Sequence, residues 1–185
     1  MDIFINESKE IETPVNLVYL WGMMGIGKTK IARQLAAKIG WQFVDTDEAI
    51  ERVTGKDVSQ IFRDDGEDAF RELERKIIEQ LANNEKTIVA TGGGLPCFLD
   101  NAELMNRTGL TIWLDGNEKF LASRLYGAKQ SRPLISSVKS KEELIDMLTW
   151  IYKNREKFYN QANWKIKALE LDLDKLAKKL KSSGA

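Results

Sequence analysis

The chain of 185 residues contains no histidine and only one cysteine, Cys97. Without histidine, a Ser-His-Asp triad and a metal site built on imidazole are both excluded. A single cysteine excludes an internal disulfide framework and a zinc site made of several thiolates. With no partner for a disulfide, Cys97 is predicted to be a small buried apolar residue rather than a redox switch.

An excess of charge and long apolar runs are missing as well. The 28 basic and 28 acidic residues cancel, so no global field favours a nucleic acid or an anionic membrane. No stretch approaches the ~18 apolar residues that a membrane-spanning helix needs. The first residues also lack the basic and apolar regions of a secretory signal. We therefore expect a cytoplasmic monomer without a nucleic-acid or membrane partner.

Five short apolar runs alternate with segments of helical spacing. This alternation predicts a three-layer α/β/α domain over residues 15–181 with a five-stranded parallel sheet. The strands are predicted at 15–21, 41–45, 87–91, 110–114 and 164–168. Helices are predicted from Lys28 to a stop at Gly40 and near 47–53, 57–63, 67–83, 100–107, 117–125, 140–157 and 172–181. Residues 1–14 are either a disordered tail or an added edge strand, and 182–185 form a frayed tail.

A Gly-x-x-x-x-Gly-Lys-Thr loop at residues 22–29 lies between the first predicted strand and the first predicted helix. Glycines let the main-chain N–H groups approach phosphate oxygens, and the helix N-terminus favours an anion. Lys28 can reach the β- and γ-phosphates, and the Thr29 hydroxyl is placed to ligate magnesium. The alternative is an ordinary glycine-rich turn, but the complete motif in this context predicts binding of a nucleoside triphosphate.

Two acids, Asp45 and Asp47, follow the predicted strand at 41–45. Carboxylates at the carboxyl end of such a strand lie where α/β proteins bind ligands. Either acid could instead cap the following helix, and the local sequence does not choose between capping and chemistry. Beside a phosphate loop, the pair suggests one acid near magnesium and the other near the phosphoryl acceptor.

Two later segments carry residues suited to an anionic acceptor. Arg71 and Glu74 are three apart on a predicted helix, so the glutamate can orient the guanidinium. In isolation, a solvated charged helix is the more common explanation for such a pair. Gly92, Gly93 and Gly94 follow a buried strand, where close backbone approach to a ligand is favoured over a plain turn.

The segment from Arg124 through Pro133 is basic and has weak periodicity. It predicts either a mobile lid or an ordinary surface loop. A kinase needs a lid because closure excludes water and brings positive charge to the transferring phosphate.

Taken together, these residues resemble the shikimate kinase family over about residues 15–170. The phosphate loop alone is shared by a vast superfamily, whereas the ordered set of motifs is specific. The motifs are Gly-x-x-Gly-x-Gly-Lys-Thr at 22–29, Asp-Thr-Asp at 45–47, Ile-Phe at 61–62, Gly-Glu at 66–67, Phe-Arg-x-x-Glu at 70–74, Gly-Gly-Gly at 92–94, Arg-Pro-Leu at 132–134 and Arg-x-x-x-Tyr at 155–159.

The resemblance implies transfer of the ATP γ-phosphoryl group to the 3-hydroxyl of shikimate, with Mg²⁺ as cofactor, on the route to chorismate and the aromatic amino acids. It implies a P-loop kinase fold with a substrate-binding segment at about 46–76 and a lid at about 125–137. The implied catalytic residues are Lys28, Asp47 and Arg132. The implied ATP contacts are Gly25, Ile26, Gly27, Lys28, Thr29, Lys30, Arg124 and Arg132. The implied shikimate contacts are Asp47, Arg71, Gly92, Gly93, Gly94 and Arg155, with Phe62 and Phe70 in the pocket wall. Thr29 would ligate the metal directly and Asp45 through water.

Two other functions remain open from the sequence. One is another small-molecule kinase of the same fold, such as a gluconate kinase, and the other is a regulatory module that binds ATP without turnover. Lys28, Asp45 and Arg132 argue against the regulatory module, because a non-catalytic binder does not need a lid arginine.

Overall fold

The computed structural model describes residues 4–7, 15–127, 135 and 137–182. They form one six-stranded sheet in the order β1-β6-β5-β2-β4-β3. Five of the strands are parallel: β2 (Leu17–Trp21), β3 (Gln42–Asp45), β4 (Thr87–Ala90), β5 (Leu110–Asp115) and β6 (Trp164–Lys167). The predicted five-stranded parallel sheet is therefore confirmed.

The sixth strand, β1 (Phe4–Glu7), pairs antiparallel with β6 at the edge of the sheet. Of the two alternatives for the N-terminal segment, the added edge strand is the one observed for these four residues. The antiparallel pairing shifts register between Phe4 and Asn6. Four strands separate β1 from β3 in the sheet order, so β1 is remote from the motifs that follow β2, β3 and β4.

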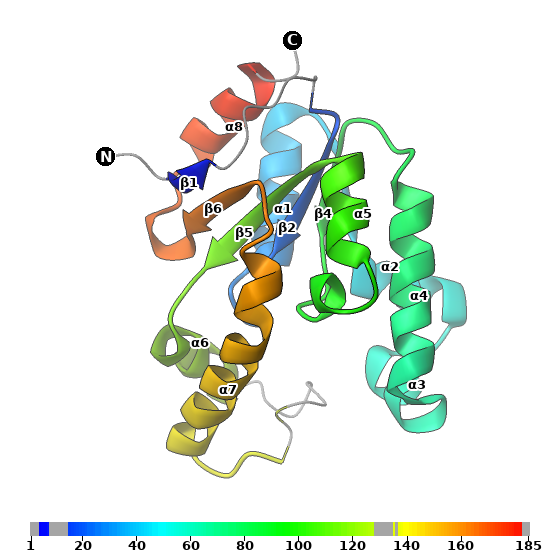
Figure 1. Cartoon of the computed structure of the whole chain (residues 1–185), viewed down its shortest axis with the longest axis vertical. Coiled ribbons are helices and arrows are strands. Elements are labelled where there is room, and N and C mark those ends of the chain that lie inside the picture. The colour runs from blue at the N-terminus through cyan, green and yellow to red at the C-terminus, as the bar shows by residue number, and fades with distance from the viewer. Residues whose placement is uncertain (1–3, 8–14, 128–134, 136, 183–185) are drawn as a thin grey trace.

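The central strand β2 is buried at all five positions. Such a continuous apolar run is expected for a strand that is covered on both faces of a parallel sheet. On one face, α1 (Lys28–Ile39) packs against β3 and β4 and against α8 (Leu173–Ser182). On the other face, α5 (Asn101–Thr108) packs against β5 and α4 (Gly66–Leu81), and Figure 1 shows α5 in front of the strands and α1 behind them.

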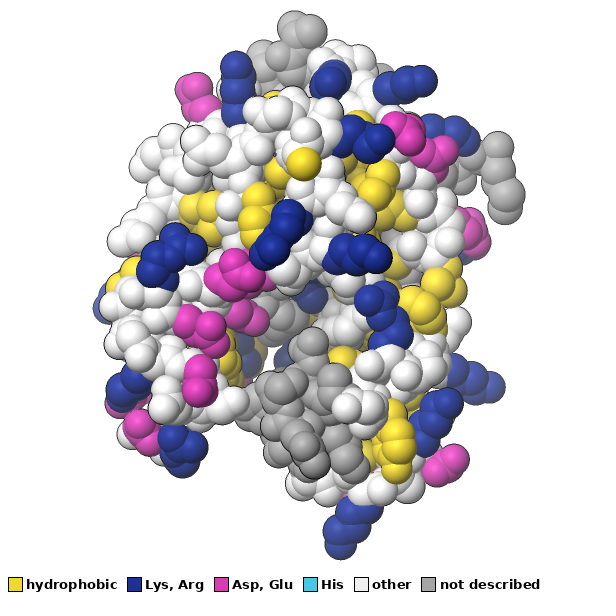
Figure 2. Space-filling view, turned by 180° about the vertical axis from the view of Figure 1, so that it is seen from behind, with side chains coloured by type: hydrophobic (Ala, Val, Ile, Leu, Met, Phe, Trp, Pro, Cys, Tyr) yellow, Lys and Arg dark blue, Asp and Glu magenta, His cyan; other side chains and the backbone are white. Residues whose placement is uncertain are grey.

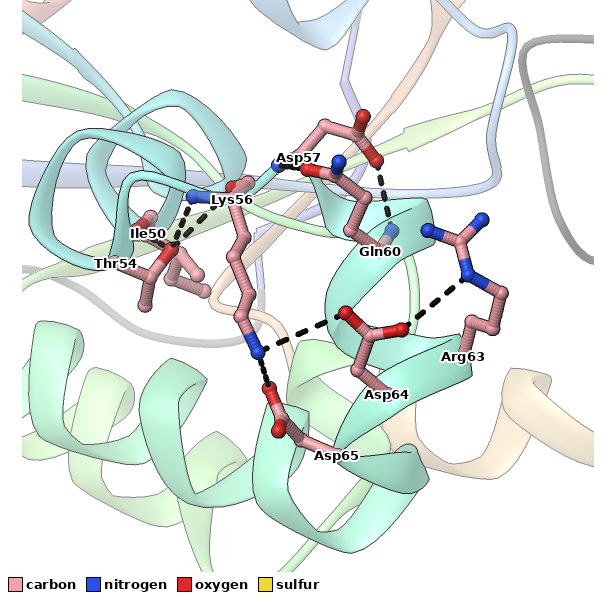
Figure 3. Close-up of polar contacts among 8 residues, drawn as sticks. All are labelled: Ile50, Thr54, Lys56, Asp57, Gln60, Arg63, Asp64 and Asp65. Atoms are coloured by element: carbon pink, nitrogen blue, oxygen red, sulfur yellow. Dashed lines mark hydrogen bonds and ion pairs between the residues drawn. The ribbon is translucent and has the colours of Figure 1, made fainter.

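Helices α2 (Thr46–Thr54) and α3 (Val58–Asp64) form a unit with α4 beside the open end of the sheet. Helix α3 begins with a capping box, in which Asp57 and Gln60 each accept from the other's backbone N–H. Lys56 Nζ contacts Asp65 at 2.7 Å and Asp64 at 3.8 Å, so it joins the end of α2 to the corner between α3 and α4 (Figure 3). These local contacts hold the segment from α2 to α4, which carries Asp47 and Arg71, in place.

The remaining helices are α6 (Glu118–Leu125) and α7 (Lys141–Tyr159), which pack against each other below the sheet (Figure 1). Two short 3₁₀ helices, η1 (Leu95–Cys97) and η4 (Ala168–Glu170), were not predicted. Every predicted helix is present with ends shifted by one or two residues, because capping residues rather than periodicity set the ends. No helix within the described ranges is both long and apolar enough to cross a membrane.

Candidate active site

A cleft of about 740 Å³ opens at the carboxyl ends of β2, β3 and β4. The cleft lies where the order of the strands in the sheet reverses: β4 and β3 lie on one side of β2, and β5 and β6 lie on the other. Open α/β sheets bind ligands at such a point. Figure 2 shows this face of the molecule hollowed near its centre, with acidic side chains along one side of the hollow.

The loop at 22–29 leaves β2 and leads into α1 with three glycines at positive φ, among them Gly27 at 104°. Gly27 is the N-cap of α1 and supplies no side chain to the first helical amides. These amides and the positive end of the helix dipole are thus available to an anion. Lys28 Nζ donates to the carbonyl oxygens of Gly22 at 2.9 Å and Met23 at 3.1 Å, which holds the ammonium group against the loop.

Asp45 contacts both the phosphate loop and the start of α2. Its Oδ1 accepts from the backbone N–H of Asp47 at 3.0 Å and of Glu48 at 3.4 Å, so it is the N-cap of α2. Its Oδ2 accepts from the Thr29 hydroxyl at 2.7 Å. The two explanations left open for this acid are therefore compatible, and the predicted metal pair of Thr29 and Asp45 lies together in the cleft.

Arg71 is buried in the wall of the cleft, on α4. Its Nη1 donates to Glu74 at 2.6 Å, and its Nε and Nη2 donate to Glu67 at 3.2 and 2.8 Å. The guanidinium also lies 3.9 Å from the ring centroid of Phe98, close enough for a cation–π contact. A solvated charged helix is thus the wrong explanation for this arginine, whose side chain is 9 % exposed.

Burial lowers the pKa of Arg71, but the ion pairs with Glu74 and Glu67 outweigh burial and hold it above its ordinary value. The opposite balance applies to Glu74, whose side chain is 1 % exposed. Burial raises the pKa of Glu74 to about 7, against the lowering effect of Arg71, while the nearby Asp47 raises it further. Arg71 is therefore a permanent cation, and the Glu74 carboxyl group beside it titrates near neutral pH.

The glycine triplet forms the floor of the cleft and needs glycine for space rather than for positive φ. A Cβ on Gly92 would lie 2.5 Å from Glu74 Oε1, and one on Gly94 would lie 2.9 Å from Arg71 Nη1. At Gly93 the neighbour would be Arg155 Nη1, at 3.2 Å. Polar side chains from α2, α4 and α7 can thus approach the backbone closely.

Arg155, on α7, lines the cleft, and its Nη1 approaches the floor at Gly93. Its positive charge acts on Tyr159, a buried residue whose pKa is raised by burial against the lowering effect of Arg155. The Tyr159 hydroxyl in turn donates to the Gly93 carbonyl oxygen at 2.5 Å. The C-terminal end of α7 therefore carries both Arg155 and the tyrosine that contacts the glycine floor.

Two further predicted ATP contacts line the cleft near the phosphate loop. Lys30 is exposed in the first turn of α1. Arg124 lies over the Phe120 ring and donates to the Ile26 carbonyl oxygen at 3.5 Å. Arg124 belongs to the last turn of α6, in agreement with the helix predicted at 117–125, so the basic segment that begins with Arg124 is helical at its start. Arg132 and most of the predicted lid lie outside the described residues.

Sequence reasoning missed the role of Thr46, which is fully buried and accepts from the Gly92 backbone N–H at 2.8 Å. It also missed Phe98, whose ring faces Arg71. Thr46 lies between Asp45 and Asp47, and Phe98 follows the glycine triplet. Their closeness in sequence to these motifs was the only signal that could have identified them. Phe62 and Phe70, predicted in the pocket wall, line the cleft with ring centroids 4.7 Å apart.

A phosphate-binding loop and a pocket lined with arginine and carboxylate side chains share this cleft, so the fold and the site define a P-loop kinase acting on a small acceptor. The shikimate kinase family model matches residues 24–183. The chain belongs to the shikimate kinase family.

The relatives agree over nearly the whole chain. A shikimate kinase of Phocaeicola vulgatus is 43% identical over 171 residues, which is 88% of this chain and 97% of the relative. The structure of shikimate kinase from Bacteroides thetaiotaomicron matches with a TM-score of 0.82 and 38% identity, covering 91% of this chain and 97% of that one. Shikimate kinase from Acinetobacter baumannii in complex with shikimate matches with a TM-score of 0.78 and 31% identity, covering 91% and 92%.

Proposed function

We propose that the protein transfers the γ-phosphoryl group of ATP to the 3-hydroxyl of shikimate, giving shikimate 3-phosphate and ADP. The observation that carries the proposal is the pair of arginines, Arg71 and Arg155, that lie against the glycine floor in the cleft that also holds the phosphate loop. Two guanidinium groups suit a carboxylate, because each presents N–H donors in a planar fork.

The roles of the residues follow from their chemistry. The loop amides and Lys28 bind the phosphates, and Arg71 and Arg155 hold the carboxylate of shikimate over Gly93 and Gly94. The hydroxyl oxygen then bonds to the γ-phosphorus as the bond to the bridging oxygen of ADP breaks. Asp47 orients the hydroxyl and accepts its proton. In such a loose transition state, positioning and charge neutralisation contribute more than a strong base.

Mg²⁺ fits the residues present. The Thr29 hydroxyl and the Asp45 carboxylate are 2.7 Å apart in the cleft, and no group of three or more His, Cys, Asp or Glu residues suited to a metal occurs within the described ranges. Such a limited donor set suits magnesium, which keeps several waters and binds through one or two protein groups plus phosphates. When bound, the ion would neutralise negative charge on the phosphates.

An acceptor panel tests the proposal. Purified protein with Mg-ATP is offered shikimate, gluconate and nucleoside monophosphates, and ADP release is measured. We expect release to depend on shikimate, and equal release with every acceptor would contradict the proposal. Arg71→Ala should lower kcat/KM for shikimate by about 10- to 150-fold, as expected for loss of a charge-assisted contact of about 1.5–3 kcal/mol.

Arg75→Ala is the matched control, because this arginine lies one turn further along α4 and pairs with Glu79 and Asp100 outside the cleft. Nucleotide binding by Arg71→Ala should stay close to that of the wild type, since Arg71 contacts the acceptor side alone. We further propose that residues 15–181 act as one domain and that the protein works as a cytoplasmic monomer with Mg-ATP. Light scattering with and without substrates measures the oligomeric state.

A further inference from the structure

Glu74 is buried at the base of the acceptor site with one carboxylate oxygen engaged and the other not. Its Oε2 accepts from Arg71 Nη1 at 2.6 Å. Its Oε1 is buried and has no hydrogen-bond partner among the residues that the structure describes. A buried oxygen of this kind is costly unless it gains a partner or a proton.

The free oxygen faces a second acid. Glu74 Oε1 and Asp47 Oδ1 converge on Gly92, where a Cβ would lie 2.5 Å from the first and 3.0 Å from the second. Two carboxylates this close in a buried site favour a state in which one of them is protonated. The direction agrees with the pKa of Glu74, which burial and then Asp47 raise to about 7 against the effect of Arg71 and Arg155.

The buried charges around Glu74 are balanced before an acceptor binds. From the elements packed against it, Arg71 and Arg155 contribute two positive charges, and Asp47 and Glu74 contribute two negative ones. Glu67 also pairs with Arg71, but its side chain is half-exposed to solvent. Cys97 from η1 stays neutral, because burial raises its pKa to about 11. The carboxylate of the acceptor adds one negative charge to this site, and added negative charge favours the neutral form of a nearby carboxyl group.

We propose that Glu74 is a positioning residue that takes up one proton when the acceptor's carboxylate binds, and that its protonated Oε1 then donates a hydrogen bond to Asp47. The proton comes from the solvent, and no bond of the substrate forms or breaks in this step. Asp47 keeps its negative charge and is oriented to accept from the substrate hydroxyl. The inference rests on the proposed function, because it needs an anionic acceptor held by Arg71 and Arg155.

Calorimetry of shikimate binding measures the proton directly. Heats are recorded at pH 7.5 in phosphate, HEPES and Tris, whose ionisation enthalpies differ, and the slope gives the protons taken up. We expect roughly half a proton per shikimate bound if the added charge raises the Glu74 pKa by about one unit. The chain has no histidine, so no imidazole can contribute to the proton uptake measured at this pH.

Glu74→Gln tests the assignment, because glutamine keeps an acceptor for Arg71 and presents an amide N–H toward Asp47. This variant should still bind shikimate, with proton uptake near zero. The variant and the wild type have the same α-amino group, so proton exchange by that group would appear equally in both proteins. Glu67→Gln is the matched control: it removes the half-exposed second partner of Arg71 and should keep the uptake of the wild type.

The outcomes separate the two proposals. Shikimate binding by the wild type without proton exchange would overturn this inference and leave the proposed function standing. Equal uptake by Glu74→Gln and wild type, or its loss in Glu67→Gln, would place the proton elsewhere and also overturn it. Absence of any shikimate-dependent heat would overturn the proposed function, and the inference with it.

Discussion

The phosphate side and the acceptor side of the cleft are built in opposite ways. The phosphate side comes from one contiguous loop, residues 22–29, whose backbone amides and Lys28 meet at the start of α1. The acceptor side is made of side chains from α2, α4 and α7 that meet over the glycine floor after β4.

This difference separates general chemistry from specific chemistry. Backbone amides at a helix N-terminus recognise phosphate in any nucleotide, so a short motif suffices. Recognition of one small acid needs charged side chains at fixed distances, and burial must keep them there. Variants on the phosphate side should therefore affect every acceptor, whereas variants on the acceptor side should affect shikimate alone.

The largest expected effect is on the phosphate side. Lys28→Ala should lower kcat by about 100- to 1,000-fold with every acceptor, the usual cost of removing a group that stabilises transition-state charge. Steady-state ADP release measures it. Lys38→Ala is the matched control, because Lys38 lies on the same helix but pairs with Asp174 away from the cleft. Retained turnover would show that the loop does not hold the transferred phosphate.

On the acceptor side, Glu74 should make stability depend on pH. Its folded-state pKa is raised from 4.5 to about 7, so its contribution is fully present below about pH 4.5 and is lost as the pH rises through 7. Relative to Glu74→Gln, the free energy of unfolding of the wild type should fall by about 2–4 kcal/mol between pH 4.5 and 7.5. Urea titrations of both proteins without substrate measure the difference, and a rise over this range would contradict the prediction.

Asp45 lies where the two sides meet, and its two roles can be separated. Asp45→Asn keeps an acceptor for the backbone N–H groups of Asp47 and Glu48, so stability should change by only a few tenths of a kcal/mol. The Mg²⁺ concentration for half-maximal activity should rise about tenfold, since a carboxylate is lost near the metal. Asp45→Ala should in addition lose about 1 kcal/mol of stability with the cap. Unchanged Mg²⁺ dependence in both variants would leave Asp45 with capping alone.

The smallest expected effect concerns Tyr159, a buried residue that contacts the backbone of the glycine floor. Tyr159→Phe removes the hydroxyl that donates to the Gly93 carbonyl, at a cost of about 1 kcal/mol. The KM for shikimate should rise about fivefold while the KM for ATP stays constant. Tyr19→Phe is the control, because that hydroxyl contacts Thr108 away from the cleft. An equal change in both KM values would mean that Tyr159 supports the whole fold rather than the acceptor side.

The local sequence was enough to predict the phosphate loop and the succession of strands and helices along the chain. The loop motif predicted its own structure because contacts that shape it lie within eight residues, such as those from Lys28 Nζ to the carbonyl oxygens of Gly22 and Met23. Strands β2, β4 and β5 follow from buried apolar runs bounded by polar residues, whereas β3 is only partly buried and β6 alternates between more and less buried positions. The helix predicted at 117–125 was confirmed, and the contacts of Arg124 with Phe120 and Ile26 lie in the last turn of α6.

The sequence by itself determined which chemistry is available: a phosphate loop, arginines and carboxylates, with no histidine. Only the tertiary structure decided how these groups act. It buries Glu74 beside Asp47, turns Asp45 into both a helix cap and a partner of Thr29, and brings Arg155 to the same floor as Arg71. The physical reason is that burial and charge pairing depend on segments far apart in the chain, and these set the protonation and orientation of each group.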